Sequence, residues 1–305
     1  MAKIGEFLWR IVVFIFEIIL SPLPFFKKFF WKRWYNWLSR DKTIEVDFLF
    51  MNYGHHEVSE NKEKLRNGEY LKKERSFYSP DNETMARLYF YLCESFSGNF
   101  RGKSLIEVGS GRGGGARFIS QNYPISSFIG IDLSTKNIDF SKDLHKNIPQ
   151  LSFMEGDAEK LPLAEGSVDI VFNVESSHCY PRFETFISEV SRVLKTGGHF
   201  IFCDFRPKEE REGLLKVFKK NGLEVLSEVD ITPNILAALD FDSEKRIALI
   251  KRLTPKFMYP IMKIFSGVKG TLVYENFKKG KLDYFHFVLA KKSKEEPTRP
   301  IEEKR

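Results

Sequence analysis

Apolar and polar residues along residues 104–204 follow patterns that predict strands and helices in turn. Apolar runs at 105–108, 128–131 and 168–172 have the length of buried strands, whereas the apolar residues of 183–193 recur at helical spacing. Strands that alternate with helices form a parallel sheet with helices on both faces. The pattern therefore predicts an α/β protein built on a doubly wound sheet.

The residues on either side of this region extend the pattern. Ser79-Pro80 predicts the start of a helix, because serine caps helices well and proline suits the first turn. Residues 209–220 predict a further helix, and residues 223–229 and 284–290 predict the last two strands.

A long insertion, at about 232–282, separates those last two strands and is far longer than an ordinary connection. Within it, the stretch from Leu236 through Phe265 has a helical pattern and is apolar and basic by turns. We expect it to form a cap over the site of a second, acceptor ligand, since flexible apolar residues suit a lipid. Ordinary packing of extra helices explains the periodicity equally well.

The N-terminal residues 1–42 predict a membrane anchor. Residues 7–20 are apolar apart from Arg10 and Glu17, and residues 25–37 interleave lysine and arginine with aromatic rings, which an interface with lipid headgroups favours. The uninterrupted apolar stretch is shorter than the about 20 residues of a spanning helix, so a span and an in-plane helix both remain open. A helix docked on the protein's own surface is a third interpretation. A span would place the catalytic region on the cytoplasmic side, because its flank is basic.

Charge is concentrated at the two ends of the chain. Of the formal net charge of +7, residues 1–42 carry +5 and residues 291–305 carry +2, so residues 43–290 are neutral. A nucleic-acid substrate usually requires a basic face, and the neutral central region argues against one. The three cysteines are scattered along the chain, and neither a disulfide framework nor a metal site is expected.

The most informative motif is Leu-Ile-Glu-Val-Gly-Ser-Gly-Arg-Gly-Gly-Gly at residues 105–115. An apolar strand leads into a glycine-rich turn and then into a helix. Glycines at 109, 111 and 113 allow a ligand to lie against bare backbone at a helix N-terminus. Gly109, Gly111 and Gly114 also match the GxGxxG of a dinucleotide site, so the motif alone leaves the ligand open.

Later segments favour a methyl donor over a dinucleotide. A second strand ends in Asp132, a Gly-Asp-Ala segment at 156–158 precedes Leu-Pro, residues 168–173 form a VDIV-type strand, and paired glycines follow Lys195. In this order the motifs resemble those of the class I S-adenosylmethionine-dependent methyltransferases. The resemblance implies a Rossmann-like, seven-stranded methyltransferase sheet with S-adenosyl-L-methionine as cofactor.

The resemblance also implies roles for single residues. Asp132 is expected to accept hydrogen bonds from both ribose hydroxyls, although it could instead cap the next helix. Asp157 is expected to accept from the adenine amino group, with Ala158 beside the ring. Glu107 is expected near the methionine part of the donor or, alternatively, as an acid that stabilises the turn. The expected donor-binding residues are Glu107, Gly109, Gly111, Gly113, Asp132, Asp157, Ala158 and Asn173.

The loop after the fourth strand is expected to face the transferable methyl group. Its sequence Val-Glu-Ser-Ser-His-Cys-Tyr-Pro, at 174–181, resembles that of phthiotriol/phenolphthiotriol dimycocerosate methyltransferases and related fatty-acid O-methyltransferases. His178 is the candidate catalytic base, because its ordinary pKa lies near neutral pH. A histidine that only shapes the pocket is the alternative, since many methyltransferases work mainly by placing the two reactants. A hydroxyl acceptor requires such a base, and a carboxylate acceptor does not.

These observations divide the chain into a membrane anchor (1–42), a connecting segment that lines the donor site (43–78), a methyltransferase domain (79–290) and a charged tail (291–305). We expect a membrane-associated enzyme that O-methylates a hydrophobic, lipid-like or polyketide-like acceptor. A C- or N-methyltransferase for a sterol, quinone or phospholipid is a second hypothesis. A membrane-tethered protein that binds the donor without turnover is the third.

Overall fold

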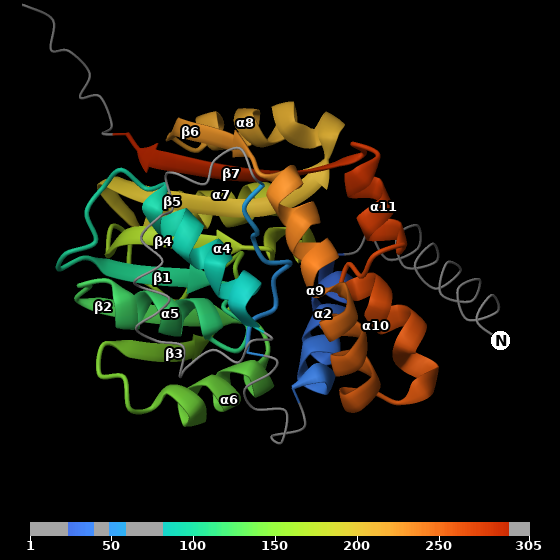
Figure 1. The fold of residues 1–305 in the computed structure, drawn as a ribbon. Coiled ribbons are helices and arrows are strands. Elements are labelled where there is room, and N and C mark those ends of the chain that lie inside the picture. The colour runs from blue at the N-terminus through green and yellow to red at the C-terminus, as the bar shows by residue number, and fades with distance from the viewer. Residues whose placement is uncertain (1–23, 40–48, 59–81, 293–305) are drawn as a thin grey trace, which may run out of the picture.

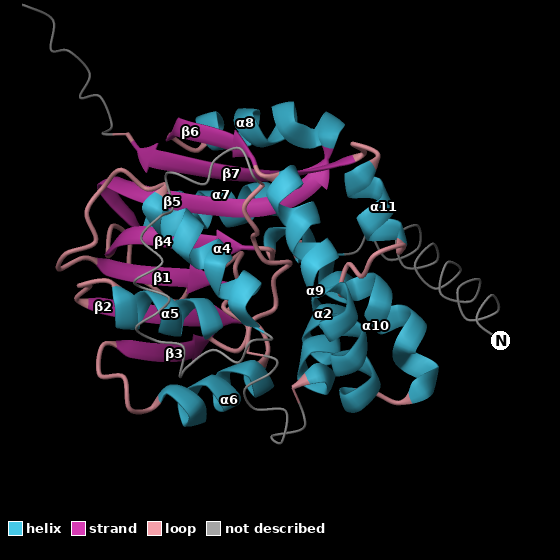
Figure 2. Cartoon of the chain, viewed as in Figure 1, coloured by secondary structure: helices cyan, strands magenta, loops and turns pink. Residues whose placement is uncertain are grey.

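The computed structural model describes residues 24–39, 49–58 and 82–292. They form a seven-stranded sheet in the order β3-β2-β1-β4-β5-β7-β6, with helices on both faces (Figures 1 and 2). The expected seven-stranded α/β sheet is thereby confirmed. The strands are β1 (Ser104–Val108), β2 (Ser127–Asp132), β3 (Leu151–Glu155), β4 (Val168–Val174), β5 (Leu194–Pro207), β6 (Leu223–Asp230) and β7 (Leu282–Lys291).

The first five strands are parallel, as the alternation of strands and helices predicted. Strand β1 pairs with β2 on one side and with β4 on the other, so the strand order reverses at β1. Strand β7 runs antiparallel between β5 and β6. In open α/β sheets a ligand binds beyond the carboxyl ends of the strands at such a reversal.

Two layers of helices cover the sheet, because each helix buries one apolar stripe against it. Helices α4, α5 and α6 contribute to a buried cluster on one face, which includes Leu88 and Phe118. Helices α7 and α8 contribute to the cluster on the other face, which includes Phe186 and Phe218. These helices are α4 (Glu83–Glu94), α5 (Gly114–Asn122), α6 (Thr135–His145), α7 (Phe183–Val193) and α8 (Arg211–Lys220), with η3 (Ser177–Cys179) and η4 (Lys208–Glu210) between strands and helices.

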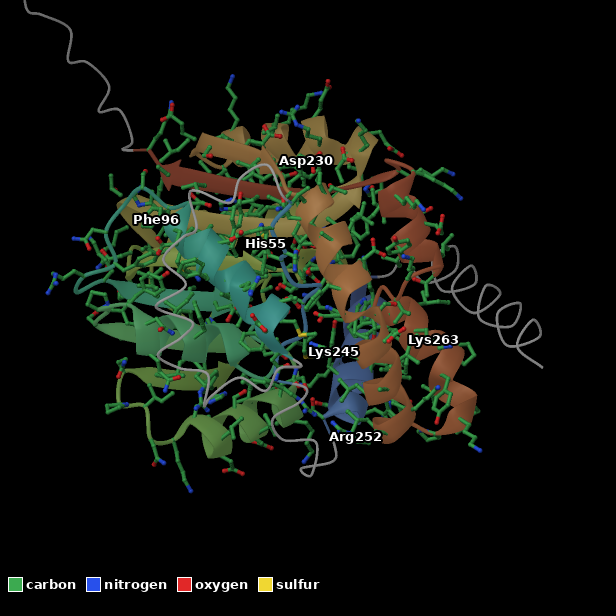
Figure 3. All side chains as sticks on the ribbon, in the orientation of Figure 1. His55, Phe96, Asp230, Lys245, Arg252 and Lys263 are labelled. Atoms are coloured by element: carbon green, nitrogen blue, oxygen red, sulfur yellow. The ribbon has the colours of Figure 1, made fainter. Side chains whose placement is uncertain are left out.

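The insertion between β6 and β7 is helical. It comprises α9 (Thr232–Leu253), η5 (Lys256–Met258), α10 (Tyr259–Phe265) and α11 (Leu272–Lys278). The pattern at 236–265 predicted one helical stretch, but the helix ends before Pro255, because a residue before proline disfavours the helical conformation. The basic residues Lys245, Arg252 and Lys263 belong to α9 and α10, on the side of the molecule where α2 lies (Figure 3).

Helix α2 (Pro24–Leu38) packs on the rest of the protein. The sequence predicted that its lysines lie among lipid phosphates. Instead, Lys28 Nζ lies 2.7 Å from Asp157 Oδ2, and Lys32 Nζ lies 2.5 Å from Glu155 Oε1. This part of the anchor prediction is corrected: a carboxylate attracts an ammonium group as a lipid phosphate does, and here the protein itself supplies the carboxylates.

The aromatic residues of α2 also contact the protein. The rings of Trp34 and Tyr35 pack edge-on against Phe265 of α10, with centroids 6.0 and 6.3 Å apart. The apolar segment 7–20 of the predicted anchor lies outside the described residues. Within the part of the chain that the structure describes, no helix has the length and apolarity needed to cross a membrane.

Candidate active site

A cavity of about 980 Å³, open solvent at its mouth included, lies at the carboxyl ends of the parallel strands. Its floor comes from the loops that follow β1, β2, β3 and β4. Helix α2 and residues 49–52 complete the wall. The sequence prediction placed a donor site at these strand ends. The share of the wall supplied by α2 was not predicted. The charged side chains and the small residues that line it include Lys28, Lys32, Gly109, Gly111, Asp132, Asp157, Ala158, Glu159 and Glu175.

The glycine loop after β1 exposes backbone to this cavity. Gly109 has φ +79°, and a Cβ atom there would lie 2.3 Å from Ser176 Oγ. Gly111, with φ +53°, also lines the cavity. Gly113 has a different reason to be glycine, because it precedes α5 in a left-handed conformation and a Cβ atom would meet the Phe153 ring at 2.5 Å. Two of the three predicted glycines therefore face the cavity, and the third lets the helix pack.

Asp132 stands at the carboxyl end of β2 with both oxygens oriented by the protein. Its Oδ2 accepts from the Gly111 N–H at 2.9 Å, and its Oδ1 accepts from the Ser134 N–H at 2.8 Å. Burial raises the pKa of Asp132 to about 6, against the lowering effect of these N–H donors. The side chain that caps α6 is Ser134, which accepts from the Asn137 N–H. Ser134, and not Asp132, is therefore the cap of this helix.

Asp157 and Ala158 line the cavity after β3, and Asp157 already has a cationic partner. Lys28 Nζ lies 2.7 Å both from Asp157 Oδ2 and from Glu159 Oε2. The Glu159 side chain is 1% exposed and is also bonded by Arg182 Nε at 2.7 Å. Lys28 can therefore keep one carboxylate partner while Asp157 receives another donor.

Two other predicted residues lie behind the wall. Glu107 is 1% exposed, and its Oε1 accepts from the Tyr89 hydroxyl at 2.6 Å. Burial raises the pKa of Glu107 to about 7. Asn173 is fully buried and its amide donates to the Val108 carbonyl at 2.8 Å and to Ser176 Oγ at 2.7 Å. Asn173 thus ties the loop after β4 to the end of β1.

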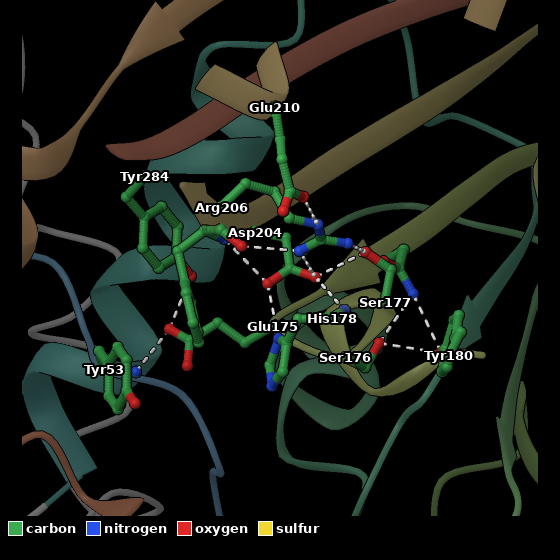
Figure 4. A network of polar contacts seen from close by, with 12 residues as sticks. Tyr53, Glu175, Ser176, Ser177, His178, Tyr180, Asp204, Arg206, Glu210 and Tyr284 are labelled. Atoms are coloured by element: carbon green, nitrogen blue, oxygen red, sulfur yellow. Dashed lines mark hydrogen bonds and ion pairs between the residues drawn. The ribbon is translucent and has the colours of Figure 1, made fainter. Parts of the chain in front are cut away.

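His178 belongs to a polar network that the sequence did not predict (Figure 4). Its Nδ1 lies 2.8 Å from Oδ1 of Asp204, a fully buried residue on β5. The other Asp204 oxygen accepts from Ser177 Oγ and from the His178 N–H, and Arg206 lies 3.2 Å away. Burial disfavours the charged ring, but Cys179 and the Asp204 carboxylate outweigh it and raise the pKa of His178. Asp204 therefore orients the imidazole and stabilises its protonated form.

The His178 ring packs against aromatic residues and does not itself line the donor cavity. It packs on Phe205 with centroids 4.5 Å apart, and Phe205 in turn contacts Tyr53 and Phe277 at 5.7 and 5.6 Å. Phe277 belongs to α11 of the insertion. His178 is not among the cavity-lining residues, although its neighbours Glu175, Ser176 and Cys179 are. The insertion thus reaches the neighbourhood of His178 through this aromatic cluster.

The cavity fits a cationic nucleoside ligand. Bare glycine backbone after β1 leaves space for close approach, and carboxylates after β2 and β3 supply acceptors for hydroxyl and amino donors. Four acidic residues and two lysines line the wall, so its balance is negative. A sulfonium ion is favoured in such surroundings.

Comparison with known proteins agrees with this site. A family model for a methyltransferase domain matches residues 106–202. The phthiotriol/phenolphthiotriol dimycocerosates methyltransferase of Mycobacterium leprae is 31% identical over 261 residues, which cover 86% of this chain and 92% of that protein. The chain belongs to this methyltransferase family. It is an enzyme that uses S-adenosyl-L-methionine as methyl donor. The fatty-acid O-methyltransferase of Mycolicibacterium smegmatis is 29% identical over 245 residues, covering 80% of this chain and 84% of that protein.

Solved methyltransferases share the fold. Geranyl diphosphate C-methyltransferase from Streptomyces coelicolor, in complex with Mg²⁺, geranyl diphosphate and S-adenosyl-L-homocysteine, has a TM-score of 0.60 and 18% identity over 87% of this chain and 98% of that chain. Phosphoethanolamine N-methyltransferase 2 from Haemonchus contortus, in complex with S-adenosyl-L-methionine, has a TM-score of 0.58 and 19% identity over 68% of this chain and 53% of that chain. At these identities the likeness establishes the fold and leaves the acceptor open.

Proposed function

We propose that this methyltransferase O-methylates a hydrophobic, lipid-like or polyketide-like acceptor at a membrane. The observation that carries the proposal is the His178–Asp204 pair, which lies beside the aromatic cluster and next in sequence to the cavity wall. An aromatic surface suits an apolar acceptor, and an oriented imidazole suits removal of a hydroxyl proton. The names of the two relatives, which refer to phthiotriol and to fatty acids, support an acceptor of lipid type.

The donor's sulfonium supplies an electrophilic methyl group, so the protein needs no covalent intermediate. In the proposed mechanism, Gly109, Gly111, Asp132 and Asp157 hold the donor, and the insertion helps to hold the acceptor. Because Asp204 engages Nδ1 of His178, Nε2 is the nitrogen that takes the hydroxyl proton. Asp204 then stabilises the imidazolium that forms. A carboxylate acceptor, already deprotonated, would make His178 dispensable.

The proposed membrane setting rests on the apolar segment 7–20, which the chain places directly before α2. An amphipathic or apolar segment adjoining an active site brings a water-insoluble acceptor to it. Phe29, 52% exposed, and Arg33 over its ring at 5.5 Å give α2 one outward aromatic and basic contact. The catalytic region is proposed to lie on the cytoplasmic side.

Incubation of the purified full chain with radiolabelled S-adenosyl-L-methionine and a total lipid extract tests the proposal. We expect label in the organic phase from the wild type and none from Asp132→Ala. Asp139→Ala, at an exposed position of α6, is the matched control and retains activity. Donor binding by calorimetry without label in any lipid would reject catalysis on lipids and favour a donor-binding protein. Partition of the chain into anionic vesicles tests the membrane setting separately.

A further inference from the structure

Glu175 is a buried carboxylate that the mechanism above leaves unused. It follows β4, lines the cavity and is 9% exposed. Its φ is +45°, and among the described residues no other non-glycine residue has a positive φ. Such a conformation costs about 1–3 kcal/mol in a long side-chain residue and persists where the surroundings enforce it, often at functional sites.

Two tyrosines hold one oxygen of this carboxylate. The Tyr284 hydroxyl, on β7, donates to Glu175 Oε1 at 2.6 Å, and the Tyr53 N–H donates to the same oxygen at 2.7 Å. Figure 4 shows the carboxylate between these two residues, to one side of the His178–Asp204 pair. Within the described part of the chain, Oε2 takes part in no hydrogen bond. The side chain is therefore fixed by one oxygen and offers the other.

The order of the strands places Glu175 at the acceptor end of the cavity. Asp157 follows β3, Asp132 follows β2 and Gly109 follows β1, and these strands are adjacent in that order. The adenine, ribose and methionine parts of the donor are assigned to them in the same order. Strand β4 comes next, so Glu175 stands where the donor ends and the acceptor begins.

The charges that line the cavity disfavour an anionic acceptor at this point, because the nearby cations His178 and Arg246 do not line it and are engaged by Asp204 and by the Tyr53 carbonyl. Its two lysines, Lys28 and Lys32, already pair with Asp157, Glu159 and Glu155 on the donor side. Glu175 is the charged residue that the β4 loop contributes to the wall. A carboxylate brought next to it would be desolvated beside a like charge, whereas a hydroxyl would donate to Oε2.

Resting on the proposed function, we infer that Glu175 determines the substrate class. It accepts a hydrogen bond from a hydroxyl of the acceptor head, other than the one that reacts, and it excludes carboxylate acceptors. The enzyme is thereby directed to a neutral, long-chain compound with more than one hydroxyl in its head and forms a methyl ether rather than a methyl ester.

The ionisation of Glu175 makes this selection depend on pH. Burial, with the Asp204 carboxylate, raises the pKa of Glu175 to about 7, although the Tyr284 hydroxyl, the Tyr53 N–H and the His178 ring act in the opposite direction. The buried Arg246 guanidinium, which donates to the Tyr53 carbonyl, is another charged group that interacts with this carboxylate. The carboxylate form, which repels an anion, therefore increases as the pH rises through about 7. Discrimination against a carboxylate acceptor should rise over the same range.

The test compares hexadecane-1,2-diol with hexadecanoic acid at about pH 8, each with radiolabelled donor. Wild type, Glu175→Gln, Glu175→Asp and the exposed control Glu224→Gln are assayed, and calorimetry verifies that each still binds the donor. We expect the wild type to label the diol at least about tenfold faster than the acid. A tenfold ratio corresponds to about 1.4 kcal/mol, which is the cost we assign to one poorly screened like charge beside the acid. Glu175→Gln should lower that ratio about tenfold, while Glu175→Asp, which keeps the charge, and Glu224→Gln should preserve it.

The outcomes separate this inference from the proposed function. Faster methylation of the acid by the wild type, or an unchanged ratio in Glu175→Gln, overturns the role of Glu175 but leaves a lipid O-methyltransferase. If neither compound is labelled, base treatment of the product from the total lipid extract decides: stable label supports the inference and labile label overturns it. Absence of label from all three sources overturns the proposed function and the inference with it.

Discussion

Lys28 Nζ lies 2.7 Å from Asp157 Oδ2, although 129 positions separate the two residues. The same ammonium group contacts Glu159, so one lysine of α2 joins the helix to two acids of the loop that follows β3. Helix α2 thereby forms part of the donor cavity. We expect release of a bound donor to require these ion pairs to loosen.

Lys28→Met should weaken donor binding. Loss of a partly buried charged contact, at a side chain that is 21% exposed, costs about 1 kcal/mol, which corresponds to a roughly fivefold higher Kd. The increase should come mainly from faster dissociation, measured by stopped-flow or surface plasmon resonance. Arg33→Met, at an exposed position of the same helix, is the control and should leave the dissociation rate unchanged. Tighter binding by Lys28→Met would mean that Lys28 competes with the donor for Asp157.

His178 and Asp204 should determine how kcat depends on pH above neutrality. Because Cys179 and Asp204 raise the pKa of His178 against the effect of burial, the neutral ring that takes a proton becomes abundant only as the pH rises. We therefore expect kcat for a hydroxyl acceptor to increase above neutral pH. Asp204→Asn should move that rise to lower pH and lower its plateau. His178→Gln should abolish it and reduce kcat by about 100-fold. A pH profile of His178→Gln that matches the wild type would assign the proton to another group.

Gly109→Ala should damage both the fold and the donor site. The added Cβ would lie 2.3 Å from Ser176 Oγ at a φ of +79°, so the loop must shift. We expect a loss of about 1–3 kcal/mol in unfolding free energy and weaker donor binding, measured by urea denaturation and calorimetry. Gly213→Ala in α8 is the matched control, since a Cβ there meets open space, and it should be neutral or stabilising by up to about 1 kcal/mol. Equal effects of the two changes would contradict the strain at Gly109.

Acid should destabilise the enzyme through its buried histidines. Burial, followed by the charge of His55, lowers the pKa of His286 to about 4, and neither ring nitrogen of His286 has a hydrogen-bond partner among the described residues. Between its ordinary pKa of about 6.5 and this value the unfolded chain binds a proton that the folded chain does not, so stability falls as the pH drops from about 6.5 to 4.

His286→Gln should flatten that acid dependence. The shift corresponds to up to about 3 kcal/mol at the acid end, so the difference in Tm between pH 7 and pH 4.5 should shrink by several degrees in a thermal-unfolding series. His56→Gln, at a less buried position nearby, is the control. An unchanged acid dependence in His286→Gln would assign it to other groups.

Local motifs were sufficient to predict residues that the structure brings to one cavity. Gly109, Asp132 and Asp157 each follow a strand at a short, regular distance, and backbone geometry places strand ends at one edge of the sheet. Their presence on or beside one cavity follows from that geometry. The polar network on the acceptor side had no such signal, because Asp204 lies on β5 and Glu175 follows β4, and only the sheet register brings them together.

The sequence pattern also could not distinguish residues that pack against neighbouring side chains from residues that line the cavity. Gly113 matched the motif for a bare loop, yet its small size serves the contact with Phe153. Glu107 matched the acid of the first strand, yet Tyr89 covers it. A motif specifies residue types and spacing, but the neighbours that fill the space come from distant segments.

The amino-acid sequence by itself determined the alternating α/β fold, the strand-end positions of the residues expected to bind the donor, and the methyl donor. These follow from local periodicity and from spacing along the chain. The tertiary structure decided which carboxylates the lysines of α2 pair with, which carboxylate orients His178, and that Tyr53 and Tyr284 hold Glu175 at the cavity wall. Those features depend on charges and rings that meet across more than twenty residues of sequence. The local sequence around an ammonium group or a carboxylate does not indicate which distant residue will pair with it.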